Sequence, residues 1–176
     1  MGLMNGKKVL MFVEDLFEDL ELMYPKLRLI EEGAAVVLAG KNTDTVYRGY
    51  HGYPVKADIR LTDVNPNNFD ILVIPGGFAP DKLRRCMDVK SITRAMHERG
   101  KIIAFICHGG WIPISAGILN GYTCTSTRGI TDDLENAGAK WVNEPVVIDR
   151  NLISSRAPDD LPAFCRAIIQ CSSNQD

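Results

Sequence analysis

Residues 101–110 read Lys-Ile-Ile-Ala-Phe-Ile-Cys-His-Gly-Gly, an apolar run of strand length that ends abruptly in polar and small residues. Ser91–Arg99 before it and Trp111–Ile118 after it have the pattern of helices, so the run is predicted to be a buried strand between them. A side chain at such a strand-to-helix turn is held at the carboxyl end of the sheet, as in a nucleophile elbow. We therefore predict that Cys107 is a nucleophile whose pKa is lowered by the following helix.

The chain on either side alternates between strand and helix patterns. Three other apolar runs have the composition of strands buried on both faces: Lys8–Val13, Ala34–Ala39 and Ile71–Ile74. Between the first two, apolar side chains recur at helical spacing, at residues 20, 24, 27 and 30. A strand, helix and strand of this length form a parallel crossover. The sequence predicts an α/β fold with a mostly parallel sheet covered by helices on both faces.

Further elements follow from the same patterns. Residues 45–60 hold Tyr47, Tyr50 and Tyr53 among glycines, which predicts a small hairpin whose tyrosines form an oligomer contact or a pocket wall. Helices are expected over 82–85, 88–99, 132–137 and 161–171, and strands over 141–147 and 152–155, with a turn at 149–151. We expect one domain over residues 1–176, with a core from about 7 to 171 and a polar tail from 172 to 176.

Composition limits the class of function. The chain has 176 residues, 45% of them hydrophobic and 24% charged, with a net charge of −2, so nucleic acid is not expected as a partner. No apolar run approaches the ~20 residues that span a bilayer, and a secretion signal is not evident, so a cytoplasmic protein is predicted. The five cysteines lack metal-type spacing, and most of them should be free thiols in a reducing compartment. We expect neither a metal nor a cofactor.

A second feature lies after the strand at residues 71–74. This strand runs into Pro75-Gly76-Gly77, where two adjacent glycines let the backbone approach a ligand and expose amide donors. Because parallel strands end at the same edge of a sheet, these amides are expected near Cys107.

Five motifs in order resemble the PfpI-type intracellular proteases of the ThiJ/PfpI family, within the class I glutamine-amidotransferase-like superfamily. They are Phe-Glu-Asp-Leu-Glu-Leu at 17–22, Pro-Gly-Gly-Phe-Ala-Pro at 75–80, Ile-Cys-His-Gly at 106–109, Gly-Ile-Thr-Asp-Asp at 129–133 with Asn-Ala-Gly at 136–138, and Ser-Ser-Arg-Ala-Pro-Asp-Asp-Leu at 154–161. The resemblance extends from about Lys7 to Ile169. It implies a flavodoxin-like three-layer sandwich.

The resemblance also implies roles for particular residues. Cys107 corresponds to the nucleophile, His108 to its catalytic partner, and Glu18 to a buried acid that hydrogen-bonds the sulfur. The backbone amides of Gly77 and His108 correspond to an oxyanion hole. Asp81 corresponds to an acidic residue that reaches the histidine of a neighbouring subunit, which implies a homo-oligomer, either a dimer or a hexamer.

The sequence departs from the family pattern in three places. Asp81 is one methylene shorter than the glutamate of PfpI itself. Phe105 occupies a position where the wider superfamily favours glycine, and Gly110-Trp111 follows Cys-His-Gly where PfpI has Pro-Gln. A glutamine amidotransferase is disfavoured because its chemistry uses a histidine late in the chain, whereas the histidines here are residues 51, 97 and 108.

Three functions are compatible with these residues. The first is a cysteine hydrolase acting on peptides or amides, in which the thiolate attacks a carbonyl and His108 transfers the proton. The second is a glutathione-independent glyoxalase or deglycase acting on small aldehydes such as methylglyoxal or on their adducts. The third is a non-enzymatic stress-response sensor or chaperone in which Cys107 is oxidised to a sulfinate.

Overall fold

The central sheet contains seven strands in the order β10-β11-β7-β6-β1-β2-β5 within residues 2–173, the part of the chain that the computed structural model describes. Every neighbouring pair is parallel except β10 and β11, which are antiparallel. The strands are β1 (Lys8–Phe12), β2 (Ala35–Gly40), β5 (Ile59–Arg60), β6 (Ile71–Ile74), β7 (Ile102–Ile106), β10 (Val146–Asp149) and β11 (Leu152–Ser155). The mostly parallel sheet predicted from the sequence is confirmed.

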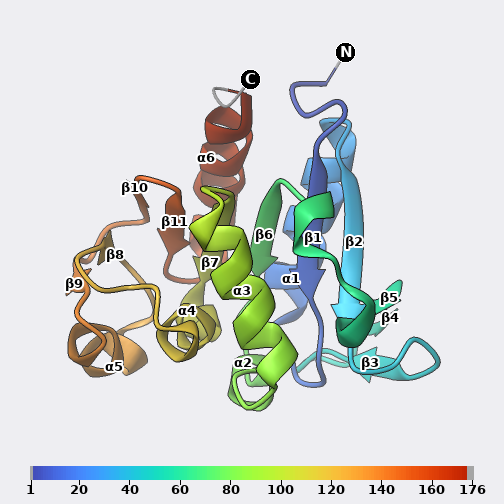
Figure 1. The fold of residues 1–176 in the computed structure, drawn as a ribbon, viewed down its shortest axis with the longest axis horizontal. Coiled ribbons are helices and arrows are strands. Elements are labelled where there is room, and N and C mark those ends of the chain that lie inside the picture. Colours follow the sequence, from blue (N-terminus) through green and yellow to red (C-terminus); the bar gives the residue numbers. More distant parts are fainter. Residues whose placement is uncertain (1, 174–176) are drawn as a thin grey trace.

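Helices cover both faces of this sheet. They are α1 (Asp19–Glu31), α2 (Ala79–Leu83), α3 (Met87–Glu98), α4 (Trp111–Ala116), α5 (Thr131–Asn136) and α6 (Leu161–Ser173). Figure 1 shows α3 in front of the sheet and α1 behind it, and α1 packs against α6 while α3 packs against α4. Short 3-10 turns occur at Leu61–Asp63, Pro66–Asn68, Cys107–Gly110, Arg128–Ile130 and Pro158–Asp160. The three-layer α/β sandwich is thereby confirmed.

Strands β1, β6 and β7 form the buried centre of the sheet. β6 and β7 are buried at every position, as are the four residues of β1 after Lys8. Burial on both faces explains why these strands read as continuous apolar runs rather than as alternating patterns. Chain order reverses between β1 and β6, and ligands of open α/β sheets bind at the carboxyl ends of strands beside such a reversal.

Two small pairs of strands lie outside the main sheet. The predicted hairpin is present as β3 (Val46–Arg48) paired antiparallel with β4 (Pro54–Lys56). The chain then adds β5 to the edge of the main sheet, which the sequence did not predict because two residues carry no periodicity. β8 (Thr123–Cys124) pairs with β9 (Lys140–Trp141).

The structure corrects several predicted boundaries. A strand over 141–147 is wrong: β9 ends at Trp141, β10 begins at Val146, and Pro145 lies in the break between them. α2 begins at Ala79 rather than at residue 82, and α4 ends at Ala116 because Gly117 takes a left-handed conformation. α6 includes Ser172 and Ser173 of the predicted tail, and residues 174–176 lie outside the described residues.

The apolar face assigned to α1 is also wrong. The side chains at helical spacing point outward, with exposed fractions of 57% for Leu20 and 59% for Leu27, whereas Leu22, Pro25 and Leu29 are buried. The helix therefore presents to the sheet a face that includes one carboxylate, Glu21. None of the helices formed by residues 2–173 is long and apolar enough to cross a membrane.

Candidate active site

Cys107 lies at the carboxyl end of β7, in the sharp turn that leads to α4. Its φ is +58°, in the left-handed region that non-glycine residues seldom adopt, which marks a strained nucleophile elbow. The turn packs directly against the end of β6, because a Cβ on Gly109 would lie 2.6 Å from the carbonyl oxygen of Ile74. Glycine at this position lets the elbow and β6 approach closely.

Two departures from the family pattern fit together in this turn. The ring of Phe105 is fully buried, and a Cβ on Gly110 would lie 3.2 Å from its Cε2 atom and 3.0 Å from Cδ1 of Ile130. The large side chain before the cysteine therefore occupies space that a side chain after it would need. Glycine at position 110 therefore accommodates the large side chain of Phe105.

Gly76 and Gly77, at the end of β6, form the second part of the site. A Cβ on Gly76 would lie 2.5 Å from Oε2 of Glu21, 2.9 Å from Cβ of Cys107 and 3.1 Å from the amide nitrogen of His108. Gly77 has a φ of +77°, and its amide and that of His108 both lower the pKa of the Cys107 thiol, which places these N–H groups toward the sulfur. An oxyanion formed at this point would meet the same two donors.

Glu21 supplies the carboxyl group of the site. It is fully buried, and its Oε2 accepts a 2.8 Å hydrogen bond from the amide of Gly76. Burial is the main cause that raises the pKa of Glu21 to about 8; the charge of Glu18 also raises it, whereas the hydrogen bond from Gly76 and the interaction with Cys107 oppose the shift. Its Oε1 has no hydrogen-bond partner among residues 2–173. A buried carboxyl with this pKa carries a proton at neutral pH.

This geometry corrects the role expected for Glu18. Glu18 is the N-cap of α1, and its Oε2 accepts the amide N–H of Glu21 at 2.8 Å, as capping residues do. The carboxyl that interacts with the thiol is that of Glu21. A signal for Glu21 was present in the sequence, since it shares one helix face with Pro25 and Leu29 at spacings of four residues, and both are buried.

The pKa expected for Cys107 is corrected as well. Burial raises the pKa of the thiol to about 12, the negative charge of Glu21 adds to the shift, and the amides of His108 and Gly77 oppose it. The following helix and its amides favour the thiolate, but desolvation of the thiol outweighs them. Because protonation of Glu21 removes its charge, the thiolate forms most readily while Glu21 holds the proton.

His108 contacts the sulfur of Cys107. Its Nδ1 lies 3.4 Å from Sγ of Cys107, and burial lowers the pKa of the imidazole, so the ring is neutral near pH 7. The ring packs against Trp111 at a centroid distance of 5.1 Å, and Nε1 of Trp111 donates to Oδ2 of Asp133 at 2.8 Å. A neutral imidazole held in this way can accept a proton from the thiol or return one to a product.

Asp81 does not belong to this cluster within one chain. It lies in α2 with its side chain 45% exposed and forms an ion pair with Arg85 one turn later.

Tyr47 of the hairpin is buried and hydrogen-bonds Asn42, so it is a core residue rather than a contact surface, whereas Tyr50 is 60% exposed. Across residues 2–173, no three His, Cys, Asp or Glu side chains lie together as a metal site would require.

A sequence model of the DJ-1/PfpI family matches residues 7–171, so the chain belongs to this family. It is 48% identical over 163 residues to the protein named Deglycase PH1704 of Pyrococcus horikoshii, covering 93% of this chain and 98% of that protein. It is 46% identical to Deglycase PfpI of Pyrococcus furiosus, with the same coverage. Membership in this family, with relatives named as deglycases, identifies the chain as an enzyme.

Solved structures agree with the assignment of the chain to this family. A two-domain protein of Anabaena variabilis with DJ-1/ThiJ/PfpI-like and ferritin-like domains superposes with a TM-score of 0.92 at 38% identity, covering 94% of this chain and 48% of that one. The chain thus spans about half of the Anabaena protein. DJ-1beta of Drosophila melanogaster gives a TM-score of 0.89 at 25% identity and covers 99% of this chain and 92% of its own.

The assignment of Glu21 rather than Glu18 predicts different effects on thiol reactivity. Glu21→Gln removes the charge that opposes thiolate formation, so the pH midpoint for alkylation of Cys107 by iodoacetamide falls. Glu18→Gln keeps an oxygen that caps α1 and leaves the midpoint close to that of the wild type. The measurement is the alkylation rate of Cys107 against pH, followed by mass spectrometry. A midpoint that moves only in Glu18→Gln would contradict the assignment.

Proposed function

We propose that the chain is a cysteine-dependent enzyme of the glyoxalase and deglycase type, acting on methylglyoxal or on its adducts with amines and thiols. The proposal is supported most by one observation: a buried carboxyl with a raised pKa interacts with an elbow thiol. Chemistry at a dicarbonyl requires both a nucleophile and a group that moves a proton between neighbouring carbons, and Cys107 and Glu21 fit these two roles.

The proposed reaction with methylglyoxal has three steps. The thiolate of Cys107 adds to the aldehyde carbon to form a hemithioacetal, and the amides of Gly77 and His108 stabilise the developing oxyanion. Glu21 gives its proton to this oxyanion, and the resulting carboxylate takes the proton from the same carbon. It returns that proton to the neighbouring carbon through an enediol, while the hydroxyl proton passes to the neighbouring oxygen, which gives a lactoyl thioester. Water hydrolyses the thioester to lactate and releases the thiol.

His108 serves this reaction from the side of the sulfur. Its Nδ1, at 3.4 Å from Sγ, can take the thiol proton at the start and return it when the thioester is hydrolysed. In an adduct with an amine, the bond from carbon to nitrogen breaks as the amine leaves with a proton. The same Cys–His contact also supports a cysteine hydrolase acting on peptides or amides, the second candidate.

Activity on dicarbonyls tests the first candidate against the second. We expect purified protein to convert methylglyoxal to lactate without glutathione, and Cys107→Ala to abolish the conversion. Glu21→Gln should lower kcat/KM by roughly 10²- to 10⁴-fold, the contribution of a positioned proton-transfer group. Glu18→Gln is the matched control and should stay close to wild type.

The same variants are assayed with fluorogenic peptides and with amides. Peptide or amide cleavage that requires Cys107, without turnover of methylglyoxal or its amine adducts, would favour the hydrolase. Equal activity of wild type and Cys107→Ala on all substrates would contradict both enzymatic candidates.

We also propose that the protein is a homo-oligomer, in which Asp81 of one subunit approaches His108 of the next. Exposed apolar side chains on α1, among them Leu20 and Leu27, and the exposed contact between the rings of Tyr50 and Phe78 support an association surface. Because the side chain of Asp81 is 45% exposed, a second copy of the chain could reach it.

Subunit mixing tests this arrangement. Light scattering should give a mass that is a multiple of 19.5 kDa. If Asp81 acts on a neighbour, Asp81→Asn lowers activity, and denaturing and refolding it together with Cys107→Ala restores part of the loss. Asp88→Asn, an exposed aspartate on α3, is the control. A monomeric mass, or no recovery on mixing, would contradict the proposal.

A further inference from the structure

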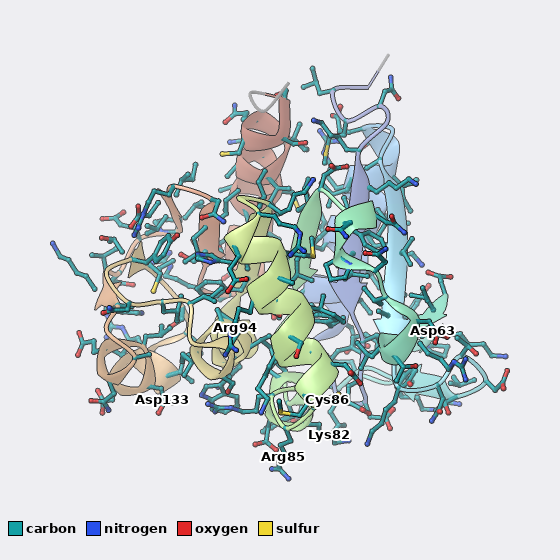
Figure 2. The ribbon with its side chains drawn as sticks, in the orientation of Figure 1. Asp63, Lys82, Arg85, Cys86, Arg94 and Asp133 are labelled. Atoms are coloured by element: carbon teal, nitrogen blue, oxygen red, sulfur yellow. The ribbon has the colours of Figure 1, made fainter. Side chains whose placement is uncertain are left out.

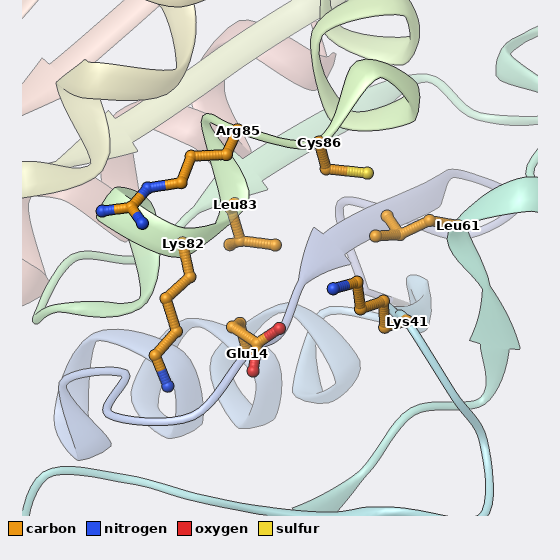
Figure 3. A pocket seen from close by; sticks show the side chains of 7 residues that line it. All are labelled: Glu14, Lys41, Leu61, Lys82, Leu83, Arg85 and Cys86. Atoms are coloured by element: carbon orange, nitrogen blue, oxygen red, sulfur yellow. The ribbon is translucent and has the colours of Figure 1, made fainter.

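A cavity of about 520 Å³ lies apart from the Cys107 cluster, and none of Cys107, His108 and Glu21 lines it. One wall is formed where three neighbouring strands end: Glu14 follows β1, Lys41 follows β2 and Leu61 follows β5. The other wall comes from α2 and the residues just after it (Figure 3). Carboxyl ends of parallel strands are where open α/β sheets bind ligands.

The charge of this cavity is mainly positive. Lys41 and Lys82 come from opposite walls, and neither has an ion-pair partner among residues 2–173. Arg85 also lines the cavity, but it pairs with Asp81 and extends away from the other lining side chains (Figure 3). Figure 2 shows Lys82 and Arg85 together at the end of the molecule where α2 lies. Two ammonium groups that have no ion-pair partner and line the same cavity favour the binding of an anion.

The remaining lining side chains limit the kind of anion. Leu61 and Leu83 are buried side chains that present an apolar surface to the cavity. Glu14 is the single carboxylate among the lining residues; its Oε1 accepts the amide N–H of Asp15, and its other oxygen accepts no hydrogen bond from residues 2–173. A carboxylate beside an anion repels it unless the ligand also offers a hydroxyl donor to that oxygen.

We propose that this cavity is a binding site for a small phosphate monoester that carries a hydroxyl group. Lys41 and Lys82 bind the phosphate, Glu14 accepts the hydroxyl, and the carbon chain lies against Leu61 and Leu83. The site is separate from the thiol chemistry and does not depend on it.

Calorimetric titration of the whole protein with glycerol phosphate tests the site. The variant Lys41→Met/Lys82→Met should bind at least about tenfold more weakly, because two charge-assisted contacts to the phosphate are lost. The control Lys56→Met/Lys140→Met makes the same change in net charge at two exposed lysines outside the cavity and should bind as the wild type does. Equal weakening in both variants, or no binding by the wild type, would overturn the proposal.

Two further titrations define the ligand and the place. Glu14→Gln should bind inorganic phosphate more tightly than the wild type and lose the preference for glycerol phosphate over inorganic phosphate; an unchanged preference would overturn the role of Glu14. Cys107→Ser should bind glycerol phosphate as the wild type does. Loss of binding in Cys107→Ser would place the phosphate at the elbow amides and overturn the separate site. Tighter binding of citrate than of glycerol phosphate would overturn the choice of a phosphate ligand.

Discussion

The hydrogen bond from the Gly76 amide to the buried carboxyl of Glu21 is the interaction on which the candidate site depends. It joins α1, which follows β1, to the turn that follows β6, and it fixes the carboxyl beside the Cys107 thiol at the end of β7. Burial of an ionisable group is costly unless the group is neutral and hydrogen-bonded. Glu21 is hydrogen-bonded through Oε2, and its raised pKa of about 8 means that it holds a proton near neutral pH and can release it there.

Close backbone packing at the carboxyl edge of the sheet makes that interaction possible. Gly76 leaves room for the carboxyl, the Cys107 side chain and the His108 amide, and Gly109 lets the elbow turn contact the end of β6. The positive φ of Cys107 stores strain that the surrounding core maintains, since β6 and β7 are buried at every residue. The Cys107 thiol is thus placed by fully buried strands of the sheet.

Much of this arrangement can be predicted from the sequence. Buried strands of a parallel sheet are long apolar runs, and such runs located β1, β6 and β7, the elbow at Cys107 and the glycine turn at Gly76-Gly77. The acid is harder to assign, because Glu18 and Glu21 are only three residues apart at the start of the same helix. They differ in which side of α1 they lie on, and that depends on which side of the helix faces the sheet. The apolar side chains used to predict the buried side, such as Leu27, face outward. The pKa of Cys107 depends on desolvation, which no sequence pattern reports.

The raised pKa of Glu21 implies that this carboxyl is protonated at neutral pH beside Cys107. The most direct test of this protonation state is the titration of the Glu21 side-chain carboxyl carbon by NMR in protein labelled at that carbon, with the resonance assigned by its absence in Glu21→Gln. We expect a midpoint near pH 8, because burial outweighs the hydrogen bonds that favour the charged form. A midpoint near the model-peptide value of about 4.3 would contradict it.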